Sequence, residues 1–369
     1  MSEAVELQSV PETLNPADPK RFSQGTILPI FERMRAEAPV HYCADSPYGP
    51  FWSITRYHDI MAVDKNHEVF SSEARLGGII IDDGIVGDEG SDFFVKSFIT
   101  MDPPEHGPQR KAVNRIVAPP SLANFESLIR TRTQTLLDSL PVGEEFDWVD
   151  RVSIELTTMM LATLFDFPFE DRRKLTRWSD VTTAEADSPI VGSQEQRVAE
   201  LFECLEYFKR LKAERRDGPA NLDLVTMLAQ DAATKDQPDH EFLGNLMLLI
   251  VGGNDTTRNT MSGSVNAFNQ FPGELERLRA NPDLLDNMIS EVVRWQTPLA
   301  HMRRTAVADC EVGGRTIKKG DKVVMWYYSG NRDEAVFPDG DTFDITRPNA
   351  RSTISFGFGI HRCLGMRLA

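Results

Sequence analysis

The sequence predicts a mainly α fold with small β-sheets, organised as a single domain over residues 1–369. From Ser121 to Gln296, apolar residues recur at spacings of three and four through successive segments, which is typical of amphipathic helices. Apolar and aromatic runs between turn-rich stretches indicate short strands near both ends of the chain. A hydrophobic fraction of 41% is enough for a sizeable core.

The composition limits the possible partners and location. A formal net charge of −16 disfavours nucleic acid and anionic membranes as general partners, because the field of the protein repels phosphate. The N-terminus is polar and acidic, and the most apolar run, Phe242–Val251, is about half of the ~20 residues needed to span a bilayer. The 4 cysteines lie far apart and show no disulfide framework. We therefore expect a soluble, cytoplasmic protein without a membrane anchor.

The N-terminal part mixes short helices with a hairpin. Residues 1–20 contain several prolines and no sustained period, so they are expected to form an irregular arm. The pattern of Ile27–Ala38 predicts a short helix, and Tyr57–Asn66 predicts another. Between them, Val40–Tyr42 and Phe51–Thr55 flank a turn-rich stretch and predict a hairpin.

Two segments that follow are less regular. Ser71–Gly90 combines the apolar run Leu76–Ile81 with several glycines, and the simplest interpretation is a strand followed by an acidic loop. Met101–Arg110 opens the next helix, with prolines at its first turn. His106 and Arg110 are four residues apart and project from one face, which by itself is usual for a solvated surface.

A series of helices then leads to a long central one. The earlier helices are predicted at Ser121–Leu140, Asp150–Phe165, Phe169–Ala186, Ser193–Arg216 and Leu222–Asp231. The longest is predicted at Asp239–Gln270, apolar on several sides and therefore buried.

The middle of that helix, Gly252–Thr257, has poor helix propensity, and each glycine costs about 1 kcal/mol relative to alanine. A kink or close helix packing would explain this cost, and so would a functional site. Leu248, Gly252, Thr256 and Asn259 share one face.

The C-terminal third begins with a helix at Pro282–Gln296 that carries Glu291 and Arg294, a spacing that alone indicates an ordinary surface pair. Thr297–Arg304 is predicted to be extended. Short strands are predicted at Cys310–Thr316 and Lys322–Tyr327, followed by an irregular acidic stretch.

The most distinctive segment is Phe356–Gly365, with three glycines and one cysteine. The glycines favour a tight loop that closely approaches a flat or bulky group. Helix formers follow Cys363, so we predict it at a helix N-terminus, which would lower the pKa of its thiol and suit a metal ligand. It could instead be a small buried hydrophobe, or half of a zinc site with His361, although no CxxC or HxxxH lies nearby.

This loop resembles the haem-binding signature of cytochrome P450 enzymes, FGxGxHxCxG, at every fixed position. DPPEHxxxR, GGNDTT and ExxR precede it in the order found in that family, so the resemblance covers the whole chain. It implies the cytochrome P450 fold, a triangular helical haem domain with a long central helix. The chain ends six residues after Cys363, whereas the family continues further. We therefore expect a C-terminally truncated chain that binds haem poorly by itself.

The resemblance assigns roles to individual residues. Cys363 becomes the axial ligand of the iron of haem b, in a loop that includes Phe356 and Gly357. The implied partners of the haem propionates are His106, Arg110 and Arg304, with Arg303 as an alternate to Arg304, and His361 is implied to bind the cofactor at the rim of the site.

On the opposite side, Gly252 would leave room for dioxygen, and Asp255 and Thr256 would deliver protons. Glu291 and Arg294 would form a buried structural pair behind the haem. The segment Ser71–Gly90 would cover the substrate pocket, for which the candidate lining residues are Ile79, Leu248, Leu299 and Ala300.

The implied activity is monooxygenation, the insertion of one oxygen atom of O2 into an unactivated C–H bond. LIVGGNDTTRNTMSG, PLAHMRRTA and SFGFGIHRCLG resemble the bacterial family that hydroxylates medium-chain alkanes and fatty acids at the terminal carbon. Electrons would come from NAD(P)H through ferredoxin reductase and a ferredoxin, which would dock on a local basic face formed by Arg110, Lys111, Arg115, Arg362 and Arg367.

Four alternatives remain: hydroxylation of another apolar substrate such as a terpene or steroid, a peroxide-driven peroxygenase, a non-catalytic haem protein, and a haem-free helical binding protein. The pair Asp255–Thr256 argues against the peroxygenase.

Overall fold

A computed structural model describes residues 14–83, 95–184 and 188–369. Its helices are α1 (Pro19–Ser23), α2 (Leu28–Glu37), α3 (Tyr57–Lys65), α4 (His106–Asn114), α5 (Pro119–Asp138), α6 (Glu155–Phe165), α7 (Arg173–Thr183), α8 (Gln194–Arg215), α9 (Leu224–Gln230), α10 (Asp239–Gln270), α11 (Pro272–Ala280), α12 (Leu285–Gln296) and α13 (Tyr327–Gly330). The strands are β1 (Val40–Cys43), β2 (Phe51–Ile54), β3 (Phe70–Ser71), β4 (Met302–Ala306), β5 (Cys310–Val312), β6 (Arg315–Ile317) and β7 (Lys322–Met325).

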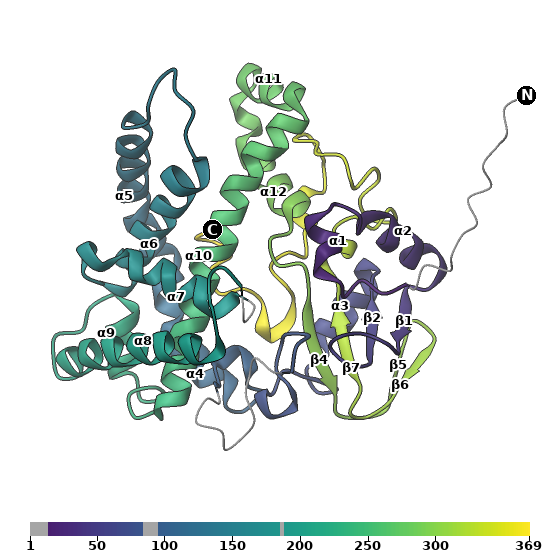
Figure 1. Ribbon diagram of the computed structural model, residues 1–369, viewed down its shortest axis with the longest axis horizontal. Coiled ribbons are helices and arrows are strands. Elements are labelled where there is room, and N and C mark those ends of the chain that lie inside the picture. Colours follow the sequence, from purple (N-terminus) through teal and green to yellow (C-terminus); the bar gives the residue numbers. More distant parts are fainter. Residues whose placement is uncertain (1–13, 84–94, 185–187) are drawn as a thin grey trace, which may run out of the picture.

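The molecule has a helical half and a half that contains the strands (Figure 1). Helix α10 crosses the helical half and packs against α6, α7, α8 and α12. Its buried residues Phe242, Leu246 and Ile250 belong to the largest hydrophobic cluster, together with residues of α6 to α9. Because this helix is apolar on several sides, neighbours surround its N-terminal half.

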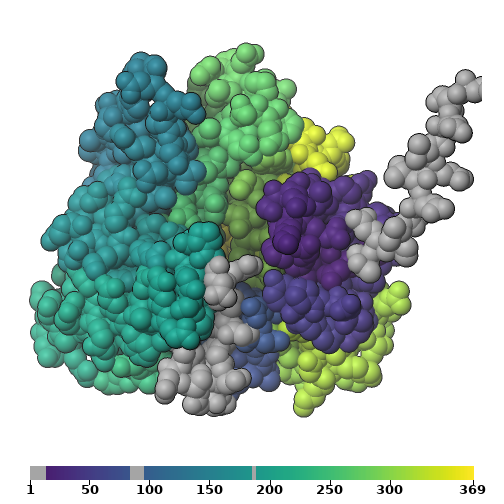
Figure 2. All heavy atoms as spheres, viewed as in Figure 1, coloured from purple at the N-terminus to yellow at the C-terminus, as the bar shows by residue number. Residues whose placement is uncertain are grey.

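The strands form a five-stranded sheet in the order β1-β2-β7-β4-β3 and a separate two-stranded sheet, β5-β6. β1 and β2 form the predicted hairpin, with Val40 opposite Ile54, and β2 continues into the sheet through a parallel pairing with β7. Helices α1 to α3 lie beside this sheet, and the space-filling surface is recessed between them and helices α7 and α8 (Figures 1 and 2).

The predicted fold class is confirmed, and the bounds of most elements agree within a few residues. The central helix has the predicted bounds, Asp239–Gln270. The prediction of one helix at Asp150–Phe165 is refined, because its first turns, Val149–Ile154, are a π-helix. α11 was not predicted from the sequence.

Two local predictions were wrong. The helix expected after Cys363 is a series of turns, because six residues can close too few hydrogen bonds to offset the cost of nucleation. The segment Ser71–Gly90 ends its strand at Ser71 and forms a 3₁₀ turn at Ala74–Leu76, and residues 84–90 lie outside the described part. Across the three described ranges, no helix combines the length and apolar character needed to span a bilayer.

Candidate functional site

The cysteine loop, Phe356–Gly365, is a tight turn closed by a hydrogen bond from the backbone N–H of Cys363 to the carbonyl of Phe356, at 2.8 Å. Gly357 and Gly359 have φ values of 65° and 69°, in the left-handed region that favours glycine. A 3₁₀ turn, Gly359–His361, follows and directs His361 into the protein, where it is buried.

The pKa of the Cys363 thiol is raised, contrary to the sequence prediction. The loss of solvation around the sulfur raises it most, although the residue as a whole is exposed. Hydrogen bonds from the backbone N–H groups of Gly365 and Met366, and the charges of Arg110 and Arg362, act in the opposite direction. The sulfur is therefore surrounded by donors and cations that stabilise a thiolate, but without a helix dipole behind it.

His106 and His361 meet beside this loop, with their ring centroids 4.4 Å apart in a T-shaped arrangement. Both rings are buried, and the Nε2 of His106 and both ring nitrogens of His361 have no hydrogen-bond partner among the described residues. Burial, followed by the charge of Arg304, lowers the pKa of His361 to about 2, and burial likewise lowers the pKa of His106. Both imidazoles are therefore neutral, with polar atoms available to a ligand.

Two arginines complete this group. Arg110 donates to the carbonyl of Arg362 at 2.5 Å, which ties α4 to the cysteine loop. Arg304 is 1% exposed and donates from Nη2 to the buried carboxylate of Asp64 at 2.7 Å and from Nη1 to the carbonyl of Arg303. A guanidinium carries five N–H donors, so both arginines keep donors for another anion.

Arg303 lies on the other face of β4, so it is not an alternate to Arg304. Its guanidinium contacts the carbonyls of Leu76 and Ile80 and the carboxylate of Asp83, and its backbone N–H donates to the carbonyl of Ile79. Neighbouring residues of a strand project to opposite faces, which separates the two arginines.

Helix α10 continues through Gly252–Thr257 without a break. The hydroxyl of Thr256 donates to the carbonyl of Gly252 at 2.9 Å. A Cβ added at Gly253 would lie 2.9 Å from the Leu161 side chain, so close packing against α6 explains this glycine. A Cβ at Gly252 would meet nothing within 4 Å, so Gly252 faces open space.

The carboxylate of Asp255 is paired with Arg258, at 2.5 Å, and Arg258 also contacts Asp180 of α7 at 2.9 Å. Burial lowers the pKa of Arg258, but hydrogen bonds and charge from the two aspartates outweigh it, so the pKa is raised. Sequence reasoning missed Arg258 and Asp180. The i,i+3 spacing from Asp255 was a signal for Arg258, whereas no local signal pointed to Asp180.

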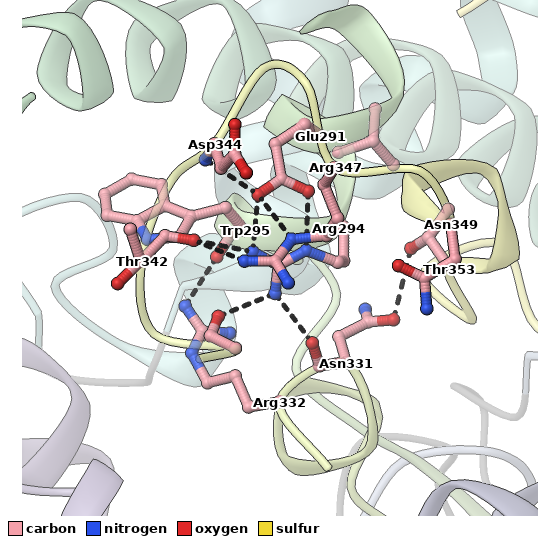
Figure 3. A network of polar contacts seen from close by, with 12 residues as sticks. Glu291, Arg294, Trp295, Asn331, Arg332, Thr342, Asp344, Arg347, Asn349 and Thr353 are labelled. Carbon is pink, nitrogen blue, oxygen red and sulfur yellow. Dashed lines mark hydrogen bonds and ion pairs between the residues drawn. The ribbon is translucent and has the colours of Figure 1, made fainter. Parts of the chain in front are cut away.

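Glu291 and Arg294 form a fully buried, bidentate ion pair with both N–O distances at 2.7 Å (Figure 3). Arg347 adds a second cation, 3.1 Å from Glu291. Arg294 also donates to the carbonyls of Asn331 and Gly340, so this pair fixes the long irregular segment that leads to the cysteine loop.

The four predicted pocket residues do not share one hydrophobic cluster. Leu248 packs against the helical cluster, whereas Leu299 packs against the cluster around the sheet. The carbonyls of Ile79 and Ala300 accept backbone hydrogen bonds from Arg303 and Tyr328.

A hollow of about 280 Å³ lies beside Cys363; its lining is Asn114, Val117, Ala118, Pro119, Cys363, Leu364, Met366 and Arg367.

The residues around the cysteine loop suit a flat cofactor that carries a metal and two carboxylates. Cys363 offers one soft ligand, and the buried nitrogens of His106 and His361, with Arg110 and Arg304, offer hydrogen-bond partners and positive charge for carboxylates. In the three ranges that the structure covers, no group of three or more His, Cys, Asp or Glu side chains could hold a metal ion, so the zinc alternative has no ligand set there.

Comparison with known proteins gives consistent matches. The family model described as "Cytochrome P450" matches residues 274–369. The chain is 38% identical over 357 residues to the linalool 8-monooxygenase of Pseudomonas putida, covering 95% of this chain and 87% of that protein. It is 34% identical to the steroid C26-monooxygenase of Mycolicibacterium smegmatis, covering 93% and 81%.

Solved structures are also similar. Cytochrome P450-153 from Novosphingobium aromaticivorans superimposes with a TM-score of 0.88 at 45% identity, covering 96% of this chain and 88% of that one. CYP153D17 from Sphingomonas sp. PAMC 26605 gives a TM-score of 0.88 at 44% identity, covering 97% and 88%.

Proposed function

The chain belongs to the cytochrome P450 family, and we propose that this monooxygenase hydroxylates the terminal carbon of medium-chain alkanes or fatty acids, with electrons from a ferredoxin. The observation that carries the proposal is the group formed by Cys363, His106, His361, Arg110 and Arg304. Its unpartnered buried nitrogens would bind the carboxylates of haem b, and its single thiol would supply a ligand to the iron. When bound, haem supplies the activation of dioxygen and the transfer of one oxygen atom to carbon.

The residues of this chain would bind and orient that cofactor. The neutral imidazoles of His106 and His361 would donate an N–H to the propionates, and Arg110 and Arg304 would balance their charge. The N–H groups of Gly365 and Met366 would donate to the sulfur of Cys363 and help to stabilise it as thiolate once the iron is bound.

Proton movement would depend on Asp255 and Thr256. The hydroxyl of Thr256 already donates to the carbonyl of Gly252, so its oxygen is free to accept a proton or a hydrogen bond beside the open space at Gly252. The carboxylate of Asp255 lies on Arg258 and must leave it, or act through water, to deliver a proton.

The substrate assignment rests on the resemblance of the segments around Gly252, Leu299 and Cys363 to terminal hydroxylases of alkanes and fatty acids. A terminal C–H bond is stronger than its neighbours, so attack there requires the chain end to be held in place. Ile79, Leu248, Leu299 and Ala300 remain the proposed lining residues. The names of two relatives, a linalool and a steroid monooxygenase, favour a terpene or steroid as the second candidate.

The proposed ferredoxin surface surrounds the hollow beside Cys363. Arg367 lines this hollow, and Lys111, Arg115 and Arg362 are exposed near it in the chain. An acidic ferredoxin would be attracted to this local patch despite the negative charge of the whole protein.

The test has two stages. First, the spectrum of the reduced, CO-bound protein should show the red-shifted Soret band of thiolate-ligated haem, and a band without that shift would overturn the role of Cys363. Second, the products formed from octane, octanoate, linalool and a steroid should be compared between reactions supplied with ferredoxin, NADH and O2 and reactions supplied with peroxide. We expect terminal alcohols from octane or octanoate, and we expect them only in the reactions that contain ferredoxin. Turnover of linalool or the steroid alone would favour the second candidate, and equal turnover with peroxide would favour a peroxygenase.

A further inference from the structure

Asp64 is a buried carboxylate that contacts the cysteine loop and Arg304 at the same time. It lies near the end of α3 and is 3% exposed. Its Oδ1 accepts from Nη2 of Arg304 at 2.7 Å. Its Oδ2 accepts from the backbone N–H of Phe358 at 2.7 Å and from the hydroxyl of Tyr327 at 2.8 Å. Three segments far apart in sequence therefore meet at one side chain.

The shape of the cysteine loop follows from this contact. A Cβ added at Gly359 would lie 2.6 Å from the carbonyl oxygen of Asp64, and one at Gly357 would lie 3.3 Å from its Oδ2. Both glycines also have positive φ values, so their conformation allows the loop to cross directly over the end of α3. The Phe358 N–H between them points at the carboxylate.

We propose that Asp64 is a positioning residue for haem, linking the loop that presents Cys363 to the arginine that binds a propionate. This inference rests on the proposed haem site and adds to it a residue outside the four family motifs. The carboxylate holds one edge of the Arg304 guanidinium, which directs its remaining donors away from α3. The same carboxylate fixes the loop five residues before the thiolate ligand.

The effect expected from a substitution of Asp64 follows from its three hydrogen-bond donors, Arg304, Tyr327 and the backbone N–H of Phe358. An amide at position 64 would remove the negative charge and present its own N–H groups to at least one of these donors, leaving buried groups without partners. Residues that orient the ligands of a metal typically change affinity by about 10–100-fold when they are mutated. We therefore expect Asp64→Asn to lose haem about 10–100-fold faster than the wild type.

The experiment compares Asp64→Asn with Asp59→Asn, the same substitution one and a half turns earlier on α3. Asp59 interacts with Arg56, His58 and Asp333 rather than with the cysteine loop, so it is a matched control. Three readouts are needed: transfer of haem to a scavenging globin, the Soret band of the reduced, CO-bound protein, and amide exchange of residues 356–363 in the haem-free protein. Asp64→Asn should lose haem faster, lose part of the thiolate-type band and exchange the loop amides faster, whereas Asp59→Asn should match the wild type.

A folded Asp64→Asn protein with wild-type haem loss and an unchanged Soret band would overturn the inference. If this variant does not fold, Asp64→Glu provides the second test, because it keeps the charge for Arg304 but displaces the acceptor from Phe358. It should also lose haem faster, and wild-type behaviour would again overturn the inference. A wild-type protein that binds haem but lacks a thiolate-type band would refute the proposed function and this inference together. A normal wild-type band with no effect at Asp64 would refute the inference alone.

Discussion

The pKa of the Cys363 thiol is raised, yet the groups around it favour the thiolate. Two backbone N–H groups and two arginines surround the sulfur, and only the loss of solvation opposes them. A bound metal ion would supply the largest positive charge at this position and would reverse the balance. The proposed ligand role of Cys363 therefore depends on its placement and not on an acidic thiol.

Thr256 and Thr260 provide a matched pair for testing proton delivery. Both hydroxyls donate to the carbonyl four residues earlier on α10, but only Thr256 adjoins Gly252 and its open space. Thr256→Ala should lower product formed per NADH consumed by about 10²-fold, the lower range for one positioned acid–base group, with an unchanged Soret band. Thr260→Ala should retain wild-type coupling. Equal losses in both variants would show that Thr256 acts only through helix stability.

His361 should make the haem-free protein sensitive to acid. Its pKa is lowered to about 2 in the folded chain, so its contribution to stability is complete above the unfolded pKa of 6.5 and is lost as the pH falls below it. Between pH ~6.5 and ~5 this histidine alone should remove roughly 1.5–2 kcal/mol, because one pH unit corresponds to about 1.4 kcal/mol. Over the same pH range, the unfolding free energy of His361→Gln should therefore fall by roughly 1.5–2 kcal/mol less than that of the wild type. If the unfolding free energies of the wild type and of His361→Gln had the same dependence on pH, His361 would not be the source of the acid sensitivity.

Among the structural elements, α12 and β4 show how charged side chains hold irregular segments. Arg294 of α12 donates to carbonyls of the segment between α13 and the cysteine loop, and Glu291 of the same helix pairs with Arg347 of that segment (Figure 3). Arg303 of β4 holds residues 76–83 by their carbonyls. Both segments contain little regular structure, so buried cations satisfy backbone acceptors that no helix or strand satisfies.

Glu291→Gln should destabilise the protein by about 3–5 kcal/mol, because it leaves Arg294 and Arg347 buried without their counter-charge. Denaturant unfolding of the haem-free protein measures this loss. Asp286→Asn on the same helix is the control, because its side chain is 84% exposed and its partner Arg351 is 4.0 Å away. That pair should contribute less than about 1 kcal/mol. A similar small effect at Glu291 would contradict the structural role.

Arg303→Leu should loosen residues 76–83. One hydrogen bond to a charged group is worth about 1.5–3 kcal/mol, so amide exchange in this segment should rise by at least about tenfold. Lys318→Leu is the control, because Lys318 is exposed and its side chain pairs with Asp309 at the open end of the β5–β6 hairpin, away from residues 76–83. If residues 76–83 border the substrate, Arg303→Leu should also raise the share of sub-terminal alcohols. Unchanged exchange would show that other contacts hold this segment.

For the molecule as a whole, a net charge of −16 coexists with Arg367 in the lining of the hollow beside Cys363 and with exposed basic residues close in sequence to that lining. Local field, and not total charge, decides how a charged partner approaches within about one Debye length, ~10 Å at 0.1 M salt. The exposed residues Lys111, Arg115, Arg362 and Arg367 are therefore able to attract an acidic protein.

Arg362→Glu should slow reduction by ferredoxin by about tenfold at low salt, and the difference should shrink near 1 M salt, where the Debye length is about 3 Å. Stopped-flow reduction over a salt series measures the effect. Arg279→Glu makes the same charge change on the exposed face of α11 and should leave the rate unchanged. Equal slowing by both variants would indicate a general charge effect and would argue against this docking patch.

Local patterns in the sequence determined most of the helices, the hairpin and the family, because helix periodicity and the FGxGxHxCxG loop depend on neighbouring residues. Only the tertiary structure decided which residues meet. The two faces of β4 separate Arg304 from Arg303, α7 brings Asp180 to Arg258, and Asp64 of α3 reaches Phe358, 294 residues later. Such contacts depend on how distant elements pack, and no sequence period records that packing.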